Sequence, residues 1–503
     1  MNTANEELIG RVRTKIVATV GPACAHKEKL RALARAGVDV FRLNFSHGAY
    51  EEHAAVLDSI REVEREEGIH LAVLQDLCGP KIRLGRLVGG TITCDYNDEF
   101  TLVTHPPGDE NPRWFSSTYH TLADDLEVGQ AVLFADGNVG MVVVERGPGW
   151  ARMRTTLPGV LRSNQGINVP GGGLSVAALT EKDLADLDWT ATHEVDYIGL
   201  SFVRHADDVI QLRGELEKRG IKARIIAKIE KPQALDNLHA IIAETDAIMV
   251  ARGDLGVELD VTRVPAAQKY IVDACHHARV PVITATQMLN SMETSSRPTR
   301  AEASDVFNAV LDGTDAVMLS GETAIGLYPV EAVSTMSRIA SEAEDLLFSR
   351  LKGGGAWTWS LPESPSIDRG LLRADLVAKA GRVQPVTESV VEAASMITRK
   401  LRAAMMAVST HSGRTALVLS KQRNASPTLA LAYDIQTARA MGLFWGVTAV
   451  LMPSVPPGSA VRAWVIEWCR ERGLLKSGDI VVGIRGSSPE DPTHNEIVVF
   501  DVS

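Results

Sequence analysis

The sequence of 503 residues has few cysteines and no closely spaced pair of them. The cysteines are Cys24, Cys78, Cys94, Cys275 and Cys469. This odd number and wide spacing exclude a zinc ribbon and a Cys-x-x-Cys redox site, so we expect reduced thiols. The thirteen histidines form no recognisable metal-binding spacing either, and we expect the adjacent His276 and His277 to be structural.

Long apolar runs and an excess of positive charge are also missing. No window approaches the roughly 18 consecutive apolar residues of a membrane span, so we expect no membrane partner. The net charge is −11, whereas nucleic-acid binding needs clustered Lys and Arg, so we expect no nucleic-acid partner. The first residues are acidic and polar, unlike a secretory signal or an Arg-rich transit peptide, which favours a cytoplasmic location.

Eight short β-rich runs are present, and most are separated by segments with helical periodicity. The runs cover residues 14–20, 40–46, 71–77, 197–202, 224–230, 247–251, 281–286 and 316–320. Clear helical patterns cover residues 26–36, 51–67, 207–219, 264–278 and 300–311. The runs are continuously apolar, which is typical of parallel strands covered on both faces. This α/β pattern predicts a (β/α)8 TIM barrel, with a doubly wound open sheet as the alternative.

Two interruptions of this rhythm indicate further domains. Between residues 86 and 170 the helical period gives way to short β runs and turns, which predicts a small β-barrel lid domain inserted into the barrel. A linker rich in Gly, Pro and Ser spans residues 352–366, and a new α/β alternation follows it. We therefore expect a catalytic barrel from residues 1–85 and 171–345, a lid from 86–170 and a C-terminal α/β regulatory domain from 346–503.

Polar residues gather where the predicted barrel strands end. Lys228 and Glu230 end one strand and Asp254 follows the next, so the two carboxylates could bind one hard divalent cation beside the ammonium. Function in a (β/α)8 barrel lies at the carboxyl ends of its strands. The polar residues expected on this rim are Arg42, Asn44, Ser46, Asp76, Lys228, Glu230, Asp254, Thr284, Thr286, Ser320 and Glu322. Such a set suits an oxyanion or enolate.

Long ordered motifs make the chain resemble the pyruvate kinases. They are TKIVATVGP (14–22), FRLNFSHG (41–48), DLCGPKIR (76–83), IAKIE (226–230), VARGDLGVE (250–258), TATQML (284–289), SRPTRAE (296–302) and MLSGET (318–323). The inserted domain matches at QGIN (165–168), and the C-terminal domain matches more loosely. The resemblance implies a glycolytic phosphotransferase that moves the phosphoryl group of phosphoenolpyruvate to ADP, giving pyruvate and ATP.

The resemblance also implies how the reacting groups are bound. Glu230 and Asp254 would bind Mg2+ or Mn2+, which stabilises the enolate. Lys228 would neutralise charge on the phosphoryl group and the enolate. Arg42 and Arg83 would clamp phosphate oxygens through their guanidinium forks.

Further implied roles concern the substrate carboxylate and the nucleotide. Thr286, with the backbone N–H groups of Gly253 and Asp254, would bind the carboxylate, and Thr286 would also belong to the water relay that protonates the enolate. The positions that match the nucleotide side are Pro22, Asn44, His47 and Arg83.

Two positions depart from common forms of the family. Many members need potassium, bound by residues matching Asn44, Ser46, Asp76 and the carbonyl of Leu77, and have a glutamate where this chain has Lys81. The chain resembles the potassium-independent branch, in which a tethered ammonium supplies the monovalent charge; a solvent-facing lysine is the alternative. Gln165 replaces a common lid lysine that reaches the nucleotide, which could weaken ADP binding or alter lid closure.

A loop of the C-terminal domain resembles an effector site. Small and hydroxyl residues join a strand to a helix there, and such loops bind anions through backbone N–H groups. The loop residues are Thr410, Ser412, Gly413, Arg414 and Thr415. By resemblance we expect a sugar-phosphate or nucleotide effector and a homotetramer. Two alternatives stay open: a catalytically impaired pyruvate-kinase-like metabolite sensor, and another metal-dependent barrel enzyme acting on a pyruvate enolate.

Overall fold

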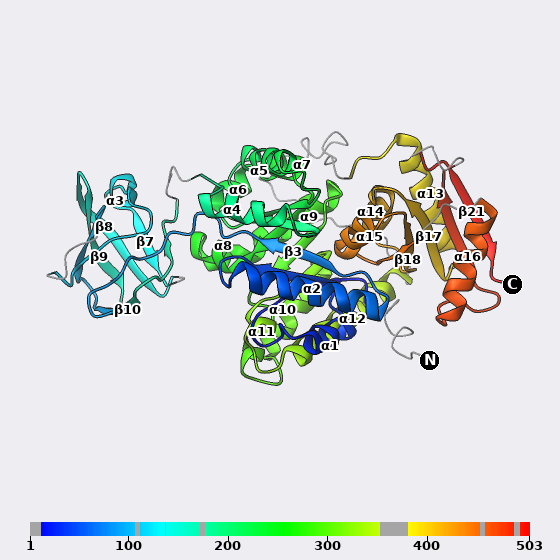
Figure 1. The fold of residues 1–503 in the computed structure, drawn as a ribbon, viewed down its shortest axis with the longest axis horizontal. Coiled ribbons are helices and arrows are strands. Elements are labelled where there is room, and N and C mark those ends of the chain that lie inside the picture. Colours follow the sequence, from blue (N-terminus) through cyan, green and yellow to red (C-terminus); the bar gives the residue numbers. More distant parts are fainter. Residues whose placement is uncertain are drawn as a thin grey trace.

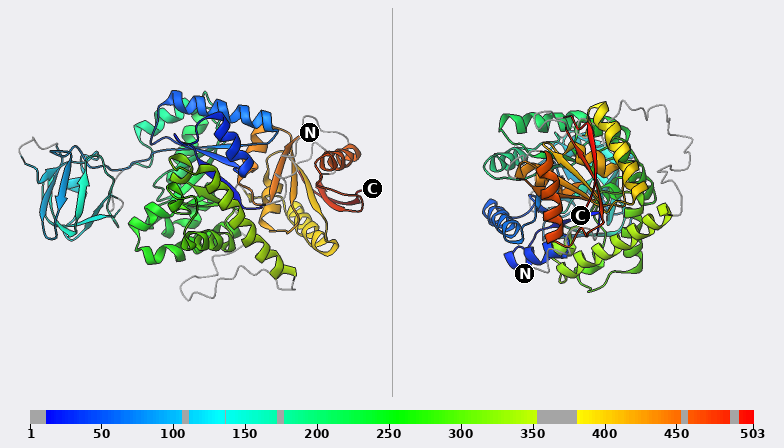
Figure 2. Two further views of the ribbon diagram at one scale, coloured as in Figure 1. Left: turned by 90° about the horizontal axis from the view of Figure 1, so that it is seen from below. Right: turned by 90° about the vertical axis from the view of Figure 1, so that its right-hand side faces the viewer.

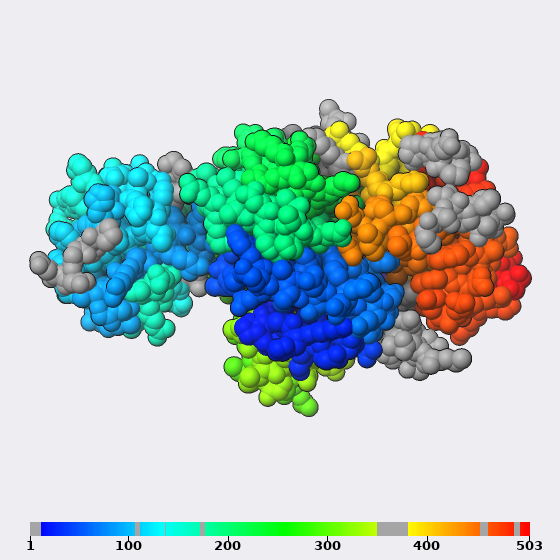
Figure 3. All heavy atoms as spheres, in the orientation of Figure 1, coloured from blue at the N-terminus to red at the C-terminus, as the bar shows by residue number. Residues whose placement is uncertain are grey.

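The computed structural model describes residues 12–105, 111–135, 137–171, 177–352, 381–452, 458–486 and 493–503. A β-rich lid, a central barrel and a C-terminal α/β domain follow one another along the long axis of the molecule (Figures 1 and 3). The lid and the C-terminal domain lie at opposite ends of the barrel, as a second view confirms (Figure 2). The end of the barrel that faces the lid is therefore the end away from the C-terminal domain.

Eight parallel strands close into a barrel, each paired with two neighbours. In order around the barrel they are β1 (Lys15–Thr19), β2 (Val40–Asn44), β3 (Ala72–Asp76), β12 (Tyr197–Leu200), β13 (Arg224–Ile229), β14 (Ala247–Ala251), β15 (Val282–Ala285) and β16 (Ala316–Leu319). The predicted (β/α)8 architecture is confirmed, and the open doubly wound sheet is excluded by the pairing of β1 with β16.

Helices surround the barrel and bury the apolar side chains on the outer face of its strands. They are α1 (Lys27–Ala36), α2 (Tyr50–Glu67), α4 (Glu181–Thr190), α5 (Ala206–Lys218), α6 (Pro232–Asp236), α7 (Leu238–Glu244), α8 (Arg252–Glu258), α9 (Val264–His277), α10 (Arg300–Asp312), α11 (Gly321–Ala324) and α12 (Pro329–Lys352). Thr180 and Thr299 begin α4 and α10 as capping boxes, because each hydroxyl accepts from the N–H three residues later. Short 3-10 turns occur at Val261–Arg263 and Asn290–Glu293.

The lid is a curled β domain inserted after β3. Its strands are β4 (Thr91–Cys94), β5 (Glu99–Val103), β6 (Trp114–Phe115), β7 (Ala131–Phe134), β8 (Val139–Gly147), β9 (Trp150–Leu157), β10 (Gly159–Arg162) and β11 (Ile167–Asn168), with the short helix α3 (Leu122–Asp125). Six of them form one sheet in the order β11-β7-β8-β9-β5-β6, and β10 pairs with β4. Phe100, Phe115 and Phe134 lie in a core separate from that of the barrel, so the lid packs as its own unit.

The C-terminal domain is a five-stranded sheet with helices, as the sequence predicted. Its strands are β17 (Met405–Thr410), β18 (Thr428–Ala432), β19 (Val447–Leu451), β20 (Ile480–Arg485) and β21 (Glu496–Asp501), in the order β19-β18-β17-β20-β21, and only β21 runs antiparallel. Its helices are α13 (Pro385–Leu401), α14 (Arg414–Lys421), α15 (Ile435–Ala440) and α16 (Gly458–Glu471), with a 3-10 turn at Met441–Leu443. The predicted linker, residues 352–366, lies outside the described residues except for its first position.

The C-terminal domain closes the amino-terminal end of the barrel. Tyr197 of β12 belongs to the same apolar core as Leu417 and Phe444 of the C-terminal domain. At the foot of β16, Asp315 accepts hydrogen bonds from Lys421 at 2.6 Å and Arg423 at 2.9 Å, and all three are buried. The open end of the barrel is therefore its carboxyl rim, which faces the lid. Among the described residues, no helix is long and apolar enough to cross a membrane.

Candidate active site

Lys228 occupies the centre of the carboxyl rim, at the end of β13. Its Nζ lies 3.2 Å from Asp76 Oδ1 and 3.0 Å from Glu230 Oε1, and donates to Ser201 Oγ at 2.8 Å. The ammonium therefore has one hydrogen-bond acceptor, Ser201, and two carboxylates as ion-pair partners. The predicted convergence of Lys228, Glu230 and Asp76 is confirmed. Ser201 was not predicted, because nothing in its sequence context distinguishes it from a buried strand-end serine.

The charge of Lys228 is fixed by its neighbours. Burial alone would lower the pKa of this ammonium, but Asp76 and Glu230 outweigh burial, so the pKa of Lys228 lies above its ordinary value. Lys228 therefore stays protonated throughout the physiological range, which suits it to stabilise negative charge and excludes it as a general base.

Arg42 of β2 is tied to the same carboxylate. Its Nε donates to Asp76 Oδ2 at 2.7 Å and its Nη2 lies 2.6 Å from that oxygen, while Nη1 donates to Thr19 Oγ1 at 3.0 Å. Burial alone would raise the pKa of Asp76, but Lys228 and Arg42 bring it below its ordinary value. Asp76 is therefore an ionised anchor that orients two cations toward the rim.

Glu230 and Asp254 are carboxylates on neighbouring units of the rim. Glu230 is buried, and its Oε2 accepts from the N–H of Phe202 at 2.8 Å. Burial raises the pKa of Glu230, Lys228 opposes this, and the negative charge of Asp254 adds to the rise. A bound cation would relieve this repulsion, so the pair fits a divalent metal. Among the described residues, no group of three or more His, Cys, Asp or Glu side chains is placed to hold one metal ion.

Lys81 brings a further cation to this cluster. Its Nζ lies 3.9 Å from Asp254 Oδ1, and the two side chains are 31% and 30% exposed. Two of the oxygens expected to bind potassium accept hydrogen bonds from the protein: Leu77 O accepts from Ser201 Oγ at 2.8 Å, and Asn44 Oδ1 accepts from the N–H of Ser46 at 3.1 Å. Lys81 therefore lies beside a candidate metal ligand, which argues against a purely solvent-facing lysine.

Thr286 follows β15 in an unusual backbone conformation. Its φ is +68° and that of Gln287 is +54°, which costs about 1–3 kcal/mol for each such non-glycine residue. Thr286 Oγ1 accepts from the N–H of Gly253 at 2.7 Å and donates to the carbonyl of Ala285 at 2.7 Å. The predicted neighbourhood of Thr286 and Gly253 is confirmed.

Two other predicted rim residues, Thr284 and Glu322, lie differently. Thr284 was expected on the rim, and this is wrong: it is fully buried and its hydroxyl donates to Thr314, because it shares the outward face of β15 with Val282. Glu322 is also buried, and its carboxylate accepts the N–H groups of Leu289 at 3.0 Å and Ser320 at 2.7 Å. Glu322 therefore satisfies backbone donors of the two neighbouring loops.

The predicted nucleotide-side residues lie at the edge of the site. Pro22 and His47 are exposed, while Asn44 ends β2. Arg83 lies where the chain enters the lid, and its Nη1 donates to the carbonyl of Asn164 at 3.2 Å. Gln165 Oε1 accepts from the N–H of Arg162 at 2.7 Å, so its side chain closes a lid turn.

The predicted effector loop borders a pocket of about 740 Å³ between the barrel and the C-terminal domain. Ser412, Gly413 and Arg414 line it, and the loop is tied to the barrel because Ser412 O accepts from Arg224 at 3.0 Å. The N–H of Gly413 donates to Thr410 Oγ1 at 3.0 Å. Thr415 is buried, and its hydroxyl is hydrogen-bonded to His494 Nδ1 at 3.1 Å. The loop residues therefore divide between the pocket and the domain interior.

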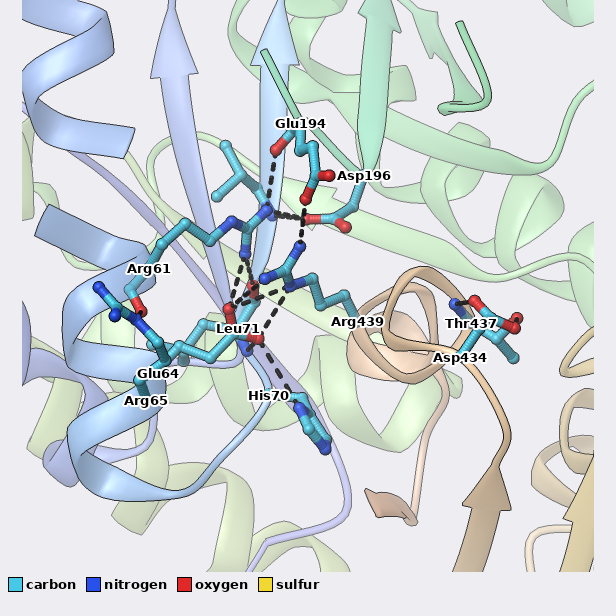
Figure 4. A network of polar contacts seen from close by, with 11 residues as sticks. Arg61, Glu64, Arg65, His70, Leu71, Glu194, Asp196, Asp434, Thr437 and Arg439 are labelled. Atoms are coloured by element: carbon cyan, nitrogen blue, oxygen red, sulfur yellow. Dashed lines mark hydrogen bonds and ion pairs between the residues drawn. The ribbon is translucent and has the colours of Figure 1, made fainter. Parts of the chain in front are cut away.

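Figure 4 shows a network of ion pairs. Two of its members, Glu194 and Asp196, also line this pocket. Arg439 of α15 donates from Nε to both carboxylate oxygens of Glu64, at 2.9 and 3.0 Å, and its Nη1 lies 3.2 Å from Glu194. Burial alone would raise the pKa of Glu64, but His70, Arg439 and Arg61 lower it to about 2. His70 Nδ1 is 3.7 Å from the carboxylate, beyond hydrogen-bond distance, so Arg439 is the firmer cause.

Comparisons with known proteins show the family of the chain. Two family models match, "Pyruvate kinase, barrel domain" over residues 11–333 and "Pyruvate kinase, alpha/beta domain" over residues 388–500. The chain is 41% identical over 482 residues to pyruvate kinase 2 of Synechocystis sp., covering 94% of this chain and 76% of that protein. It is 40% identical over 477 residues to pyruvate kinase of Mycobacterium intracellulare, covering 95% of each. A crystal structure of a pyruvate kinase from Cryptosporidium parvum matches with a TM-score of 0.86 and 31% identity, covering 100% of this chain and 98% of that one. The chain therefore belongs to the pyruvate kinase family.

Proposed function

We propose that this protein is an active pyruvate kinase, which transfers the phosphoryl group of phosphoenolpyruvate to ADP and yields pyruvate and ATP in glycolysis. The observation that carries the proposal is the ammonium of Lys228, oriented by Asp76, Glu230 and Ser201 at the open rim of the barrel. A preorganised cation in a water-poor site stabilises developing negative charge without having to reorganise.

The two cations on Asp76 act on the transferred group. Lys228 neutralises charge on the phosphoryl group and on the enolate that remains after transfer. Arg42 binds phosphate oxygens, since Asp76 fixes the plane of its guanidinium. Arg83 contacts the phosphates from the root of the lid.

The family implies a divalent cation, and we propose Mg2+ or Mn2+ bound by Glu230 and Asp254. When bound, the cation would stabilise the carboxylate and the enolate oxygen of the substrate. The buried Glu230 is positioned for this by the N–H of Phe202, while the partly exposed Asp254 leaves room for substrate and water ligands.

The remaining substrate contacts come from residues at the edges of the rim. The N–H groups of Gly253 and Asp254 bind the substrate carboxylate together with Thr286, whose hydroxyl also joins the water relay to the enolate carbon. Asn44, His47 and Pro22 lie on the nucleotide side. Because the amide of Gln165 is uncharged and its oxygen is bonded within a lid turn, we propose that the lid contributes no cation to ADP at this position.

Potassium independence is a finer part of the proposal. The ammonium of Lys81 supplies the monovalent charge beside Asp254, and the oxygens of Asn44, Ser46, Asp76 and Leu77 do not bind potassium. The support is the 3.9 Å separation of Lys81 from Asp254 and the protein partners of Leu77 and Asn44.

A phosphorylated effector is proposed for the pocket of about 740 Å³ beside the C-terminal domain. Arg224, which touches the loop through Ser412, begins β13, and Lys228 lies near the other end of that strand. Binding of a sugar phosphate or nucleotide there can therefore act on the strand that carries Lys228. Titration of sugar phosphates and AMP against the half-saturation curve for phosphoenolpyruvate tests this, and no shift with any of them would leave the loop structural.

The assembly and the domain division are proposed as the sequence suggests. We propose a homotetramer in the cytoplasm, as the resemblance to the family implies. Sedimentation equilibrium tests the assembly. The proposed boundaries at residues 85/86, 170/171 and 345/346 can be tested by limited proteolysis.

The decisive experiment is a coupled assay for pyruvate from phosphoenolpyruvate and ADP with Mg2+. An active enzyme that loses its turnover in Lys228→Met supports the proposal. Absence of turnover together with sugar-phosphate binding would favour the impaired metabolite sensor. The replacement of the common lid lysine by Gln165, whose oxygen is bonded within the lid, supports that alternative. Cleavage of a larger substrate to pyruvate, without need for ADP, would favour the other enolate barrel.

A further inference from the structure

Arg252, the first residue of α8, is a buried arginine to which the proposed reaction gives no direct task. Its side chain is only 8% exposed. Its Nη2 donates to the carbonyl of Thr286 at 2.7 Å and to that of Gln287 at 3.3 Å, and its Nε reaches the Thr286 carbonyl at 3.3 Å. Its Nε also reaches the carbonyl of Ala285 at 3.4 Å, so one guanidinium binds the carbonyls of three consecutive residues, among them Thr286 and Gln287.

Those two residues have the left-handed backbone described above, with φ of +68° and +54°. This conformation brings the Cβ of an L-residue too close to its own backbone, and the branched Cβ of Thr286 aggravates the crowding. Such residues persist only where surrounding contacts over-determine them. Hydrogen bonds from a charged donor are among the strongest available contacts, and Arg252 supplies them at both carbonyls.

Arg252 is itself fixed, so it can act as an anchor. Its Nη1 lies 2.8 Å from Asp305 Oδ2 on α10 and donates to Gln268 Oε1 at 3.3 Å. The next residue, Gly253, donates its N–H to Thr286 Oγ1 at 2.7 Å. Consecutive residues of α8 thus bind Thr286 at both of its polar ends, the carbonyl and the hydroxyl.

We infer that Arg252 is a positioning residue for Thr286, and that it acts on the protonation of the enolate more than on phosphoryl transfer. The inference rests on the proposed function of Thr286. In that step, C3 of the enolate gains a proton to form a C–H bond, and the enolate oxygen becomes the ketone oxygen of pyruvate. Arg252 exchanges no proton, because a guanidinium stays protonated; it fixes where the Thr286 hydroxyl lies.

The test separates the two half-steps in Arg252→Met and Arg252→Lys. Single-turnover formation of ATP, stopped by acid quench, reports phosphoryl transfer. Exchange of the pyruvate methyl protons with D2O, in the presence of ATP and Mg2+, reports the proton step. We expect Arg252→Met to slow exchange at least about tenfold more than ATP formation, and Arg252→Lys to recover part of the difference.

Two control variants give the comparison. Thr286→Ala should likewise slow proton exchange more than ATP formation. Arg439→Met removes a comparably buried arginine, 10% exposed, that binds a carboxylate at the far end of the barrel. This variant should not slow proton exchange more than ATP formation. Equal slowing of both half-steps in Arg252→Met, or no slowing, overturns the inference.

A crystal structure of Arg252→Met separates this inference from the proposed role of Thr286. If Thr286→Ala slows proton exchange and ATP formation equally, Thr286 has no special role in proton transfer. The crystal structure alone then decides whether Arg252 positions Thr286. We expect residues 286 and 287 to leave the left-handed region in that variant. Retention of both positive φ angles would refute the inference whatever the kinetics show.

Discussion

Replacement of Lys81 by methionine tests the proposed source of monovalent charge. Two opposite unit charges 3.9 Å apart attract by about 1 kcal/mol in water and about 4 kcal/mol at an effective dielectric constant near 20. Because Lys81 and Asp254 are each about 30% exposed, solvent screening favours the lower figure. A loss of about 1 kcal/mol corresponds to a factor of about five to ten.

We therefore expect Lys81→Met to lower kcat/KM for phosphoenolpyruvate about five- to tenfold in potassium-free tetramethylammonium buffer, with recovery when KCl is added. The apparent affinity for Mg2+ should rise by a similar factor, because a competing cation leaves Asp254. The wild-type protein should be equally active in both buffers. Lys27→Met is the matched control, since its 30% exposed ammonium pairs with Glu62 and Glu66 on the outer helices.

Two results would refute this reasoning. Wild-type activity that collapses without potassium would show that Lys81 does not supply the charge. Full activity of Lys81→Met in potassium-free buffer would show that no monovalent charge is needed beside Asp254.

Three further predictions address the metal, the central lysine and the interface between domains. Glu230→Gln should raise the half-saturating Mg2+ concentration at least about tenfold with an unchanged circular dichroism spectrum, and an unchanged Mg2+ curve would contradict the assignment. Ser201→Ala removes an acceptor of Lys228 and should lower kcat about tenfold with little change in KM, whereas Ser201→Thr should retain more activity; equal losses would mean that packing alone is affected. Glu64→Gln should lower the free energy of unfolding by about 3 kcal/mol at neutral pH, measured by urea denaturation. The folded pKa of Glu64 is about 2, below its ordinary 4.5, so its contribution is present above pH 4.5 and is lost as pH falls toward 2; this loss should be absent in Glu64→Gln. The double variant Glu64→Gln with Arg439→Met should recover part of the lost stability. If the losses of the two single variants simply add, Glu64 and Arg439 do not interact.

The barrel could be predicted because its periodicity is local. Each strand is a short apolar run and each helix has its own repeat, so the order of elements was enough to indicate the fold. The position of the catalytic group could also be predicted, because Lys228 and Glu230 lie at the end of one strand and Asp254 follows the next strand. The carboxyl ends of parallel strands must meet at one rim.

The details of the rim depend on contacts between distant segments, which sequence alone does not specify. The pairing of β3 with β12, across the whole lid insertion, brings Asp76 and Ser201 to Lys228. The error at Thr284 has a similar cause. Two-residue spacing predicts a shared face with Thr286, but the left-handed turn after Ala285 breaks that alternation.

The ion pairs around Lys228 also bear on the order in which ligands arrive. Lys228, Arg42 and Lys81 carry three positive charges, while Asp76, Glu230 and Asp254 carry three negative ones. These six side chains are together formally neutral, within a chain of net charge −11. They therefore give little long-range electrostatic attraction for an anionic substrate. With a divalent cation the same site carries an excess of two positive charges. We expect the association rate of phosphoenolpyruvate to rise steeply with divalent-ion occupancy, so that metal supply controls substrate capture as well as chemistry.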